Sequence, residues 1–283
     1  MNPFNPSFGR IPSVYIARDD AINKIISDLD KPENINVNYL VYGMRGIGKT
    51  VFSTDLSKRM RERSDWIVVD LAMGMKLLPS LIGYLYYEVS SDLKSGFEAI
   101  AKSSNRNVLT SMFNKLREEG IKVLITLDEV KANSELRNFA AYYQLMNRQD
   151  YPISLVMTGL PENVSELQNE YVMTFLLRGK RIALSSLNLS QIELSYQRVF
   201  SNSNYQVSLE ILSKMALMTK GYSYAFQLLG YLVWKADKES KIINQKTLDQ
   251  VLPEYLLELD QNVYTKIFTS LSKRDKKFVI AMA

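Results

Sequence analysis

The sequence predicts an α/β fold in which a parallel sheet carries a phosphate-binding loop and a small all-helical domain follows it. The pattern Gly43-x-x-x-x-Gly48-Lys49-Thr50 stands between an apolar strand and the start of a helix, the order that such a loop requires. Short apolar runs alternate with helix-length segments up to residue 186, which is typical of a parallel sheet. From residue 188 onward only helix-like segments follow.

The composition is that of a globular protein large enough for two domains. The chain has 283 residues, of which 46% are hydrophobic and 23% are charged. It contains no cysteine and no histidine, which excludes disulfides, thiolate and imidazole metal sites, and Ser-His triads. Acid–base chemistry must therefore use carboxylates, Lys, Tyr or water. The net charge of +5 permits an acidic partner such as nucleic acid without identifying one.

No segment has the pattern of a targeting signal or a membrane span. The N-terminus lacks the apolar core and basic leader of a secretory signal. The longest uncharged runs, residues 77–87 and 221–234, are too short to cross a bilayer and predict buried helices. We therefore expect a cytoplasmic protein that does not bind membranes. Because the chain stops inside the apolar run from Phe278 to Ala283, we also expect the natural protein to continue.

The first 37 residues predict an extended strap followed by a helix. Three prolines in the first dozen residues favour an extended backbone, and the aromatic residues Phe4 and Phe8 between them are expected to pack down. A helix follows from about Asp19, with apolar residues at helical spacing on one face. We expect this segment to pack on the site formed by the phosphate-binding loop.

The loop after the strand Tyr39 to Tyr42 is the central motif. Its three glycines lack a Cβ and allow positive φ, so that successive N–H groups can point at an anion. The helix opening at Lys49 adds unpaired N–H groups and the positive end of its dipole. Lys49 would reach the β- and γ-phosphates, and Thr50 would offer its hydroxyl to Mg²⁺. The expected nucleotide-binding residues are Gly43, Met44, Arg45, Gly46, Ile47, Gly48, Lys49, Thr50 and Val51. The alternative is a glycine-rich turn that binds no ligand.

A second apolar strand, Lys122 to Leu127, ends in the carboxylates Asp128 and Glu129. Parallel strands end at a common edge, so Asp128 is expected to reach the Mg²⁺ through water and Glu129 to polarise an attacking water. Alternatively, the pair supplies first-turn charges for the next helix. The strand Ile153 to Met157 then ends at Thr158, whose hydroxyl would bond either the γ-phosphate and attacking water or only the local backbone.

The sequence as a whole predicts a division of the chain into four segments. We expect the strap and its helix at 1–37, the sheet domain at 38–186, a small all-helical domain at 187–245, and a linker helix with the start of another amphipathic helix at 246–283. The strand-length run from Arg181 to Leu184 follows a basic segment that contains Arg178 and Lys180.

The chain resembles ATPases of the AAA+ and STAND branch of P-loop NTPases, in particular small prokaryotic ones related in architecture to archaeal origin-recognition initiators. The resemblance rests on an ordered set of segments between residues 2 and 234: NPFNPSFGRIP, YIARDDAI, VYGMRGIGKT, LITLDEV, LVMTGLP and TKGYSYAFQLLGYLVW. It implies that residues 38–186 form a parallel-sheet P-loop NTPase domain of the ASCE and AAA+ kind and that residues 187–245 form a helical lid. It also implies that a winged-helix domain often follows, and its start would lie within residues 246–283.

The resemblance also implies roles for particular residues. Gly43 to Thr50 would be Walker A, Asp128 and Glu129 would be Walker B, and Thr158 would be sensor 1. Ile16 and Arg18 would lie beside the adenine. Arg178 and Arg181 stand where such families can place an arginine finger, and the alternative for them is a solvated basic patch. The lid departs from the family pattern: Gly221-Tyr222-Ser223 stands where STAND relatives commonly have Gly-x-Pro, and no arginine follows it, so no cationic sensor 2 is assigned.

These observations predict an ATP-binding switch protein that hydrolyses ATP, with Lys49, Glu129 and Thr158 as catalytic residues and with Thr50 and Asp128 as the Mg²⁺ site. Its expected partners are ATP and ADP together with another protein or a second copy of itself. The alternative is an initiator-like protein that binds DNA under the control of ATP. That alternative is motivated by the basic balance and by the cationic start of the segment at Lys273.

Overall fold

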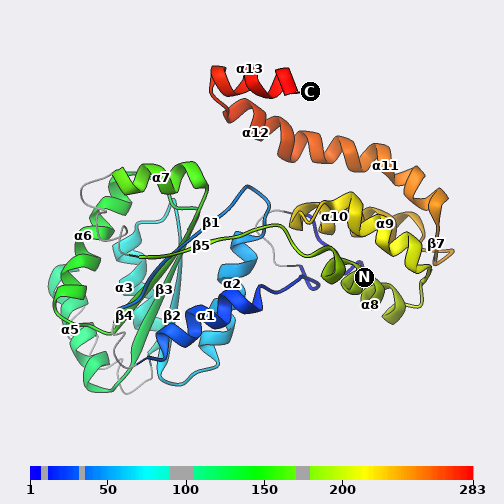
Figure 1. The fold of residues 1–283 in the computed structure, drawn as a ribbon. Helices are drawn as coiled ribbons and strands as arrows, with labels where there is room; N and C mark the ends of the chain where they lie inside the picture. The colour runs from blue at the N-terminus through cyan, green and yellow to red at the C-terminus, as the bar shows by residue number, and fades with distance from the viewer. Residues whose placement is uncertain (8–11, 32–35, 90–104, 170–178, 283) are drawn as a thin grey trace. The chain divides into compact units, whose positions relative to one another are not determined.

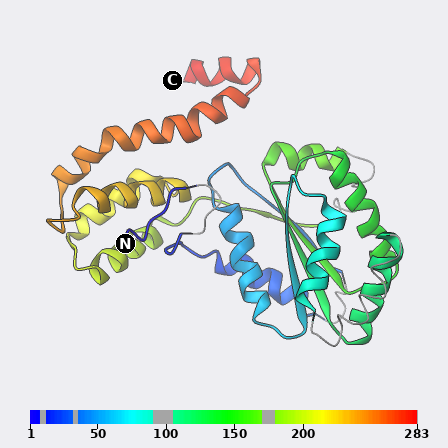
Figure 2. The same ribbon diagram turned by 180° about the vertical axis from the view of Figure 1, so that it is seen from behind.

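The computed structural model describes residues 1–7, 12–31, 36–89, 105–169 and 179–282. The chain divides into two compact units (Figures 1 and 2). The sheet unit consists of Ala17–Met44 and Lys49–Leu184. The helical unit consists of Met1–Ile16, Arg45–Gly48 and Ser185–Ala283, so it includes four residues of the phosphate-binding loop. The division into four segments expected from the sequence stays a prediction.

The sheet unit contains five parallel strands in the order β2-β3-β4-β1-β5. Their bounds are β1 (Asn38–Tyr42), β2 (Trp66–Ala72), β3 (Lys122–Asp128), β4 (Ile153–Gly159) and β5 (Lys180–Ala183). The predicted parallel sheet is therefore confirmed. Because β4 lies between β1 and β3, the ends of these three strands stand next to one another at the carboxyl edge of the sheet.

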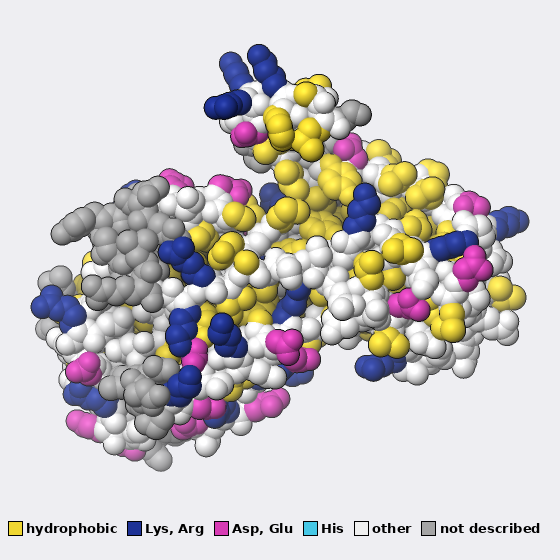
Figure 3. Space-filling view, viewed as in Figure 1, with side chains coloured by type: hydrophobic (Ala, Val, Ile, Leu, Met, Phe, Trp, Pro, Cys, Tyr) yellow, Lys and Arg dark blue, Asp and Glu magenta, His cyan; other side chains and the backbone are white. Residues whose placement is uncertain are grey.

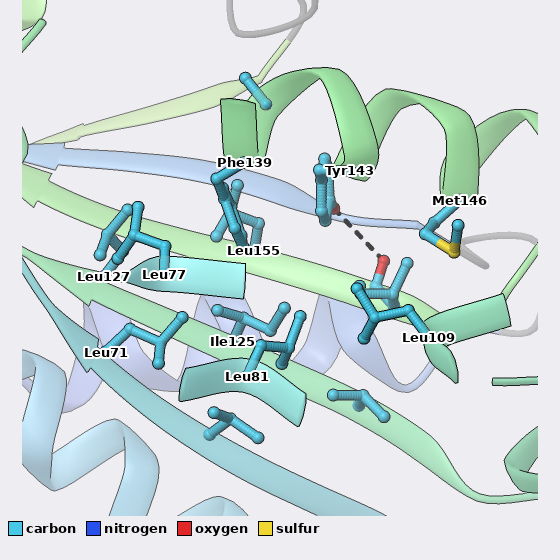
Figure 4. Packing of buried hydrophobic residues seen from close by; sticks show 14 of the residues in the cluster. Leu71, Leu77, Leu81, Leu109, Ile125, Leu127, Phe139, Tyr143, Met146 and Leu155 are labelled. Atoms are coloured by element: carbon cyan, nitrogen blue, oxygen red, sulfur yellow. Dashed lines mark hydrogen bonds between the residues drawn. The ribbon is translucent and has the colours of Figure 1, made fainter. Parts of the chain in front are cut away.

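Helices cover both faces of this sheet, which explains why its strands are almost continuously apolar. One face carries α1 (Asp19–Leu29) and α2 (Lys49–Arg61), and the other carries α3 (Leu77–Glu88), α5 (Asn105–Glu118) and α6 (Ser134–Arg148) (Figure 1). The helix α7 (Pro161–Asn169) follows β4. Alternate strand residues such as Ile125, Leu127 and Leu155 share one buried cluster with Leu77 of α3 and Phe139 of α6 (Figure 4).

A buried carboxylate, Asp28, joins α1 to the strands β1 and β5. It accepts hydrogen bonds from the Tyr39 hydroxyl and from the ammonium groups of Lys180 and Lys31, the last at 2.8 Å. Its side chain is only 8% exposed. The Lys180 ammonium, with smaller contributions from Lys31 and Tyr39, holds the pKa of Asp28 well below its ordinary value. The charged form of Asp28 is therefore the form that stabilises this junction.

We expect Asp28→Asn to lower the free energy of unfolding by about 1–3 kcal/mol at neutral pH, the usual cost of losing charge-assisted hydrogen bonds. A carboxylate with a lowered folded-state pKa stabilises above its unfolded pKa of about 4 and loses that contribution as the pH falls further. The difference between the two proteins in urea unfolding should therefore shrink below about pH 4. The control is Asp30→Asn. Asp30 forms an ion pair with Arg63 but is more exposed than Asp28, so this variant should lower the free energy of unfolding by less than about 1 kcal/mol.

In the described part of the helical unit, the regular secondary structure is helical apart from one short strand pair. Its helices are α8 (Leu189–Asn202), α9 (Leu209–Thr219), α10 (Ser223–Ala236), α11 (Gln245–Leu259), α12 (Thr265–Ser270) and α13 (Lys273–Met282), with a π-helical turn η2 (Asp260–Tyr264) between α11 and α12. The strands β6 (Gln206–Val207) and β7 (Ile242–Ile243) pair in parallel. The sequence predicted α8 to α11 and α13, but not η2, α12 or this strand pair.

Phe4 lies in the core of the helical unit, which confirms that the start of the chain packs down. The side chain is 2% exposed and contacts the rings of Tyr196, Phe200 and Phe226. Gly230 makes the space for it, because a Cβ on this glycine would come within 2.6 Å of the Phe4 ring. Phe8, the second aromatic residue of the predicted strap, lies outside the described residues.

The last helix, α13, exposes most of its side chains. None of its residues is buried, and its surface combines cationic side chains at one end with large apolar ones such as Phe278 and Ile280 (Figure 3). Among the described residues, every helix is too short or too polar to pass through a lipid bilayer.

Candidate functional site

The phosphate-binding loop begins directly after β1 and ends at the first residue of α2. Gly46 and Gly48 have positive φ, 77° and 99°, which L side chains rarely adopt, so both positions favour glycine. Gly43 behaves differently from the prediction. It does not have positive φ, because its N–H extends the sheet ladder and donates to the Gly159 carbonyl at 3.4 Å. Only the later two glycines therefore make the turn.

The Lys49 ammonium folds back into the loop that precedes it. Nζ donates to the carbonyls of Gly43 at 2.8 Å and of Met44 at 3.0 Å, and the residue is only 8% exposed. A lysine at the first position of α2 cannot reach these carbonyls unless the chain turns sharply, which Gly46 and Gly48 allow. The result is a single positive charge held inside a curved backbone, an arrangement suited to a phosphate chain.

Thr50, Asp128 and Thr158 meet at the carboxyl edge of the sheet. The Thr50 hydroxyl donates to Asp128 Oδ2 at 2.7 Å, and the Thr158 hydroxyl donates to Asp128 Oδ1. The predicted proximity of these three residues at the sheet edge agrees with the structure. The partner of the Thr158 hydroxyl is the Asp128 carboxylate, which is neither of the two alternatives expected for it. A hydroxyl and a carboxylate oxygen are ligands that Mg²⁺ accepts, so the donor set fits that ion.

Glu129 follows the strand in an uncommon backbone conformation. Its φ is 56°, a left-handed value that costs a non-glycine residue about 1 kcal/mol or more, and its N–H donates to Asp128 Oδ1 at 2.9 Å. The side chain is exposed. The following helix, α6, begins at Ser134 and is capped by Asn133. The alternative that the two carboxylates start this helix is therefore wrong.

The tip of the loop, Arg45–Gly48, belongs to the helical unit and packs against the start of α10. The Ser223 hydroxyl donates to the Ile47 carbonyl at 2.8 Å, and the Tyr224 N–H donates to the Gly46 carbonyl at 3.1 Å. The N-terminus of α10 has no side-chain cap, so the Gly46 carbonyl fills that role. Sequence reasoning missed the contact of Ser223 and Tyr224 with the loop, because the Ser223–Ile47 hydrogen bond joins residues 176 positions apart in the chain.

The other predicted site residues are placed as follows. Ile16 is half-buried against the helical unit's core, whereas Arg18 belongs to the sheet unit, where burial lowers the pKa of its guanidinium. Met44 and Arg45 are exposed, and Val51 is half-buried in the first turn of α2. Arg181 is exposed on β5, and Arg178 lies outside the described residues. Proximity of Ile16 and Arg18 to an adenine stays a prediction.

The chain is similar to one domain family and to a curated relative. The NB-ARC domain family matches residues 18–178, which is more than half of the chain. An ORC1-type DNA replication protein 1 of Thermoplasma acidophilum is 29% identical over 140 residues, which cover 48% of this chain and 37% of the relative. The match thus spans little more than a third of that relative.

Two solved structures share the fold at low sequence identity. The Aeropyrum pernix ORC2 protein, solved as ADPNP-ADP complexes, has a TM-score of 0.67 and 12% identity, covering 94% of this chain and 74% of that one. The Aeropyrum pernix ORC1 protein in complex with DNA has a TM-score of 0.55 and 14% identity, covering 94% and 71%. The resemblance to AAA+ and STAND-branch P-loop NTPases related to archaeal initiators is confirmed.

Proposed function

Because the chain belongs to the NB-ARC domain family, we propose that it is an AAA+ and STAND-type switch protein that binds ATP with Mg²⁺ and hydrolyses it slowly. The observation that carries this proposal is the 2.7 Å hydrogen bond between the Thr50 hydroxyl and the Asp128 carboxylate. It joins the end of the phosphate-binding loop to the end of β3. A glycine-rich turn that binds no ligand does not require a hydroxyl and a carboxylate, two oxygen ligands for a metal ion, at the same sheet edge.

In this proposal the loop binds the phosphates and Lys49 offers its ammonium to the β- and γ-phosphate oxygens in place of the loop carbonyls. Thr50 and Asp128 would hold Mg²⁺, which when bound supplies positive charge beside the phosphates. Glu129 would orient the attacking water and accept a hydrogen bond from it. Thr158 would keep the Asp128 carboxylate in position through their hydrogen bond, which supports a positioning role for this threonine.

We further propose that the nucleotide state is passed to the helical unit, which would act as a lid. The division of the loop supports this idea. Gly43, Met44, Lys49 and Thr50 belong to the sheet unit, whereas Arg45–Gly48 belongs to the helical unit. Loss of the γ-phosphate would change the contacts of Arg45–Gly48, and the hydrogen bonds of Gly46 and Ile47 with the start of α10 would pass that change on within the helical unit. Ser223 and Tyr224 would then do in part what a cationic sensor 2 does in relatives.

The test of this function is a calorimetric titration with ATP and with ADP, each with Mg²⁺ and with EDTA, combined with a hydrolysis assay. We expect both nucleotides to bind, Mg²⁺ to strengthen ATP binding, and turnover to be slower than about 1 s⁻¹, the low end for enzymes. Particle size measured with each nucleotide would report self-association. Failure of both nucleotides to bind, with and without Mg²⁺, would remove the proposal.

A second candidate function is DNA binding controlled by ATP. It is favoured by the cationic residues Lys273, Arg274 and Lys277, which are exposed on α13, and by the name of the Thermoplasma relative. Duplex DNA should then bind with an affinity that falls steeply with salt. If no binding occurs at low salt in the presence of ATP, this candidate is excluded and the switch without DNA remains.

A further inference from the structure

The carboxylate of Asp70 joins three elements of the sheet unit. Its Oδ1 accepts hydrogen bonds from the Ser57 hydroxyl at 2.6 Å and from the Thr126 hydroxyl at 2.5 Å. Its Oδ2 accepts from Arg61 Nη2 at 2.7 Å. Ser57 and Arg61 lie on α2, Thr126 lies on β3, and Asp70 itself lies on β2. One acidic group therefore connects the helix that carries Lys49 to the strand that ends in Asp128.

This connection lies just inside the proposed metal site. Asp70 pairs in register with Thr126, and two residues further along Ala72 pairs with Asp128. Side chains two residues apart in a strand point to the same face, so Asp70, Thr126 and Asp128 all face α2. The helix and β3 are thus joined twice. One link is the Thr50–Asp128 bond at the sheet edge, and the other passes through Asp70 deeper in the unit.

The two hydroxyls determine the strength of the deeper link. Ser57 is fully buried and Thr126 is only 3% exposed, and a buried hydroxyl is costly to leave without an acceptor. The Arg61 pair is different, because the Arg61 and Asp70 side chains are 43% and 40% exposed and such ion pairs contribute little. Within this link, the hydroxyl bonds therefore contribute more than the ion pair to holding α2 against β3.

We propose that Asp70 is a positioning residue for Thr50 and Asp128, the two residues that would hold Mg²⁺. This inference rests on the proposed function. By fixing α2 against β3 it keeps the Thr50 hydroxyl and the Asp128 carboxylate at the separation that both oxygens need to serve one ion. Mg²⁺ demands a near-ideal octahedral geometry, so a small displacement of either oxygen weakens its binding. The Asp70 link does not use the Thr50–Asp128 bond, so it persists when that bond opens to admit the ion.

The test compares nucleotide binding by the whole chain and by Asp70→Ala over a titration of Mg²⁺ and in EDTA. Loss of a partner that orients a metal ligand typically lowers metal affinity about 10- to 100-fold. We expect the Mg²⁺ concentration for half-maximal strengthening of ATP binding to rise about tenfold in Asp70→Ala. Affinity for ATP in EDTA should change less than about twofold, because the loop itself is intact. If Asp70 only stabilised the fold, Asp70→Ala would change the Mg²⁺ midpoint and the ATP affinity in EDTA to a similar extent.

Two control variants define the cause. Asp70→Asn keeps an oxygen acceptor for both hydroxyls and should retain the Mg²⁺ dependence of the unmodified chain. Asp55→Ala removes another buried carboxylate of α2, the partner of Arg59 at 3.1 Å, and should lower thermal stability without shifting the Mg²⁺ midpoint. If Asp70→Ala fails to fold, Thr126→Val removes one hydroxyl at nearly constant shape and should raise the midpoint severalfold.

An unchanged Mg²⁺ midpoint in Asp70→Ala or Thr126→Val, or an equal loss of affinity with Mg²⁺ and in EDTA, would overturn the inference alone. Absence of nucleotide binding by the unmodified chain would instead overturn the proposed function, and the role of Asp70 would fall with it.

Discussion

Replacement of Lys49 by alanine is expected to weaken ATP binding at least about 100-fold. The ammonium is buried inside the loop and already makes two hydrogen bonds to loop carbonyls, at 2.8 and 3.0 Å. In the proposed complex phosphate oxygens replace these acceptors, and charge-assisted hydrogen bonds contribute about 1.5–3 kcal/mol each. Two such bonds correspond to a change in affinity of two orders of magnitude or more. Calorimetric titration with Mg²⁺ and ATP measures it directly.

The control for this variant removes one positive charge from another position on the same helix, α2. Lys58 is exposed on α2, so Lys58→Ala removes one ammonium without touching the loop and should leave ATP affinity within about twofold. Saturating ATP should raise the melting temperature of the unmodified chain and of Lys58→Ala, but not that of Lys49→Ala. Equal affinities in Lys49→Ala and the unmodified chain would show that the loop does not bind the phosphates.

Replacement of Glu129 by glutamine is expected to slow ATP turnover by about 100-fold or more while affinity for ATP stays within about threefold. Gln has the same shape as Glu but is a much weaker acceptor for a proton of the attacking water. The left-handed φ of 56° belongs to the backbone, so this substitution leaves the conformation of the strand end in place. Single-turnover hydrolysis of bound ATP separates the chemical step from product release.

The control for this variant is Glu118→Gln, which neutralises an exposed carboxylate at the end of α5. It should turn over ATP at the rate of the unmodified chain. Turnover by Glu129→Gln at the same rate would refute the assignment of Glu129, whereas loss of ATP binding in that variant would mean that the residue holds the ligand rather than the water.

The elements that could be predicted from the sequence are those encoded locally. The strands β1, β3, β4 and β5, the helix after the loop and the carboxylates at the end of β3 follow from hydrophobic runs and motif spacing within short windows. The proximity of Thr50 and Asp128 also follows, because parallel strands end at a common edge. For this reason the central part of the candidate site agrees with the prediction.

The contacts that were missed depend on the register between distant elements. The position of Asp70 between Ser57 and Thr126 requires knowing which strand neighbours β3 and how the two are aligned. Gly43 was expected to have positive φ because it is a motif glycine, but its N–H pairs with a strand carbonyl. The short β6–β7 pair has only two residues in each strand, too few for a sequence pattern.

The carbonyl of Gly46 that caps α10 ties one backbone amide to the shape of the loop. The Tyr224 N–H stays protected from exchange with solvent deuterium only while that carbonyl remains in place. An event that reshapes the glycine turn should therefore unmask this amide first, before the rest of the helix frays. The rate of deuterium exchange at the Tyr224 amide should therefore report changes in the conformation of the loop.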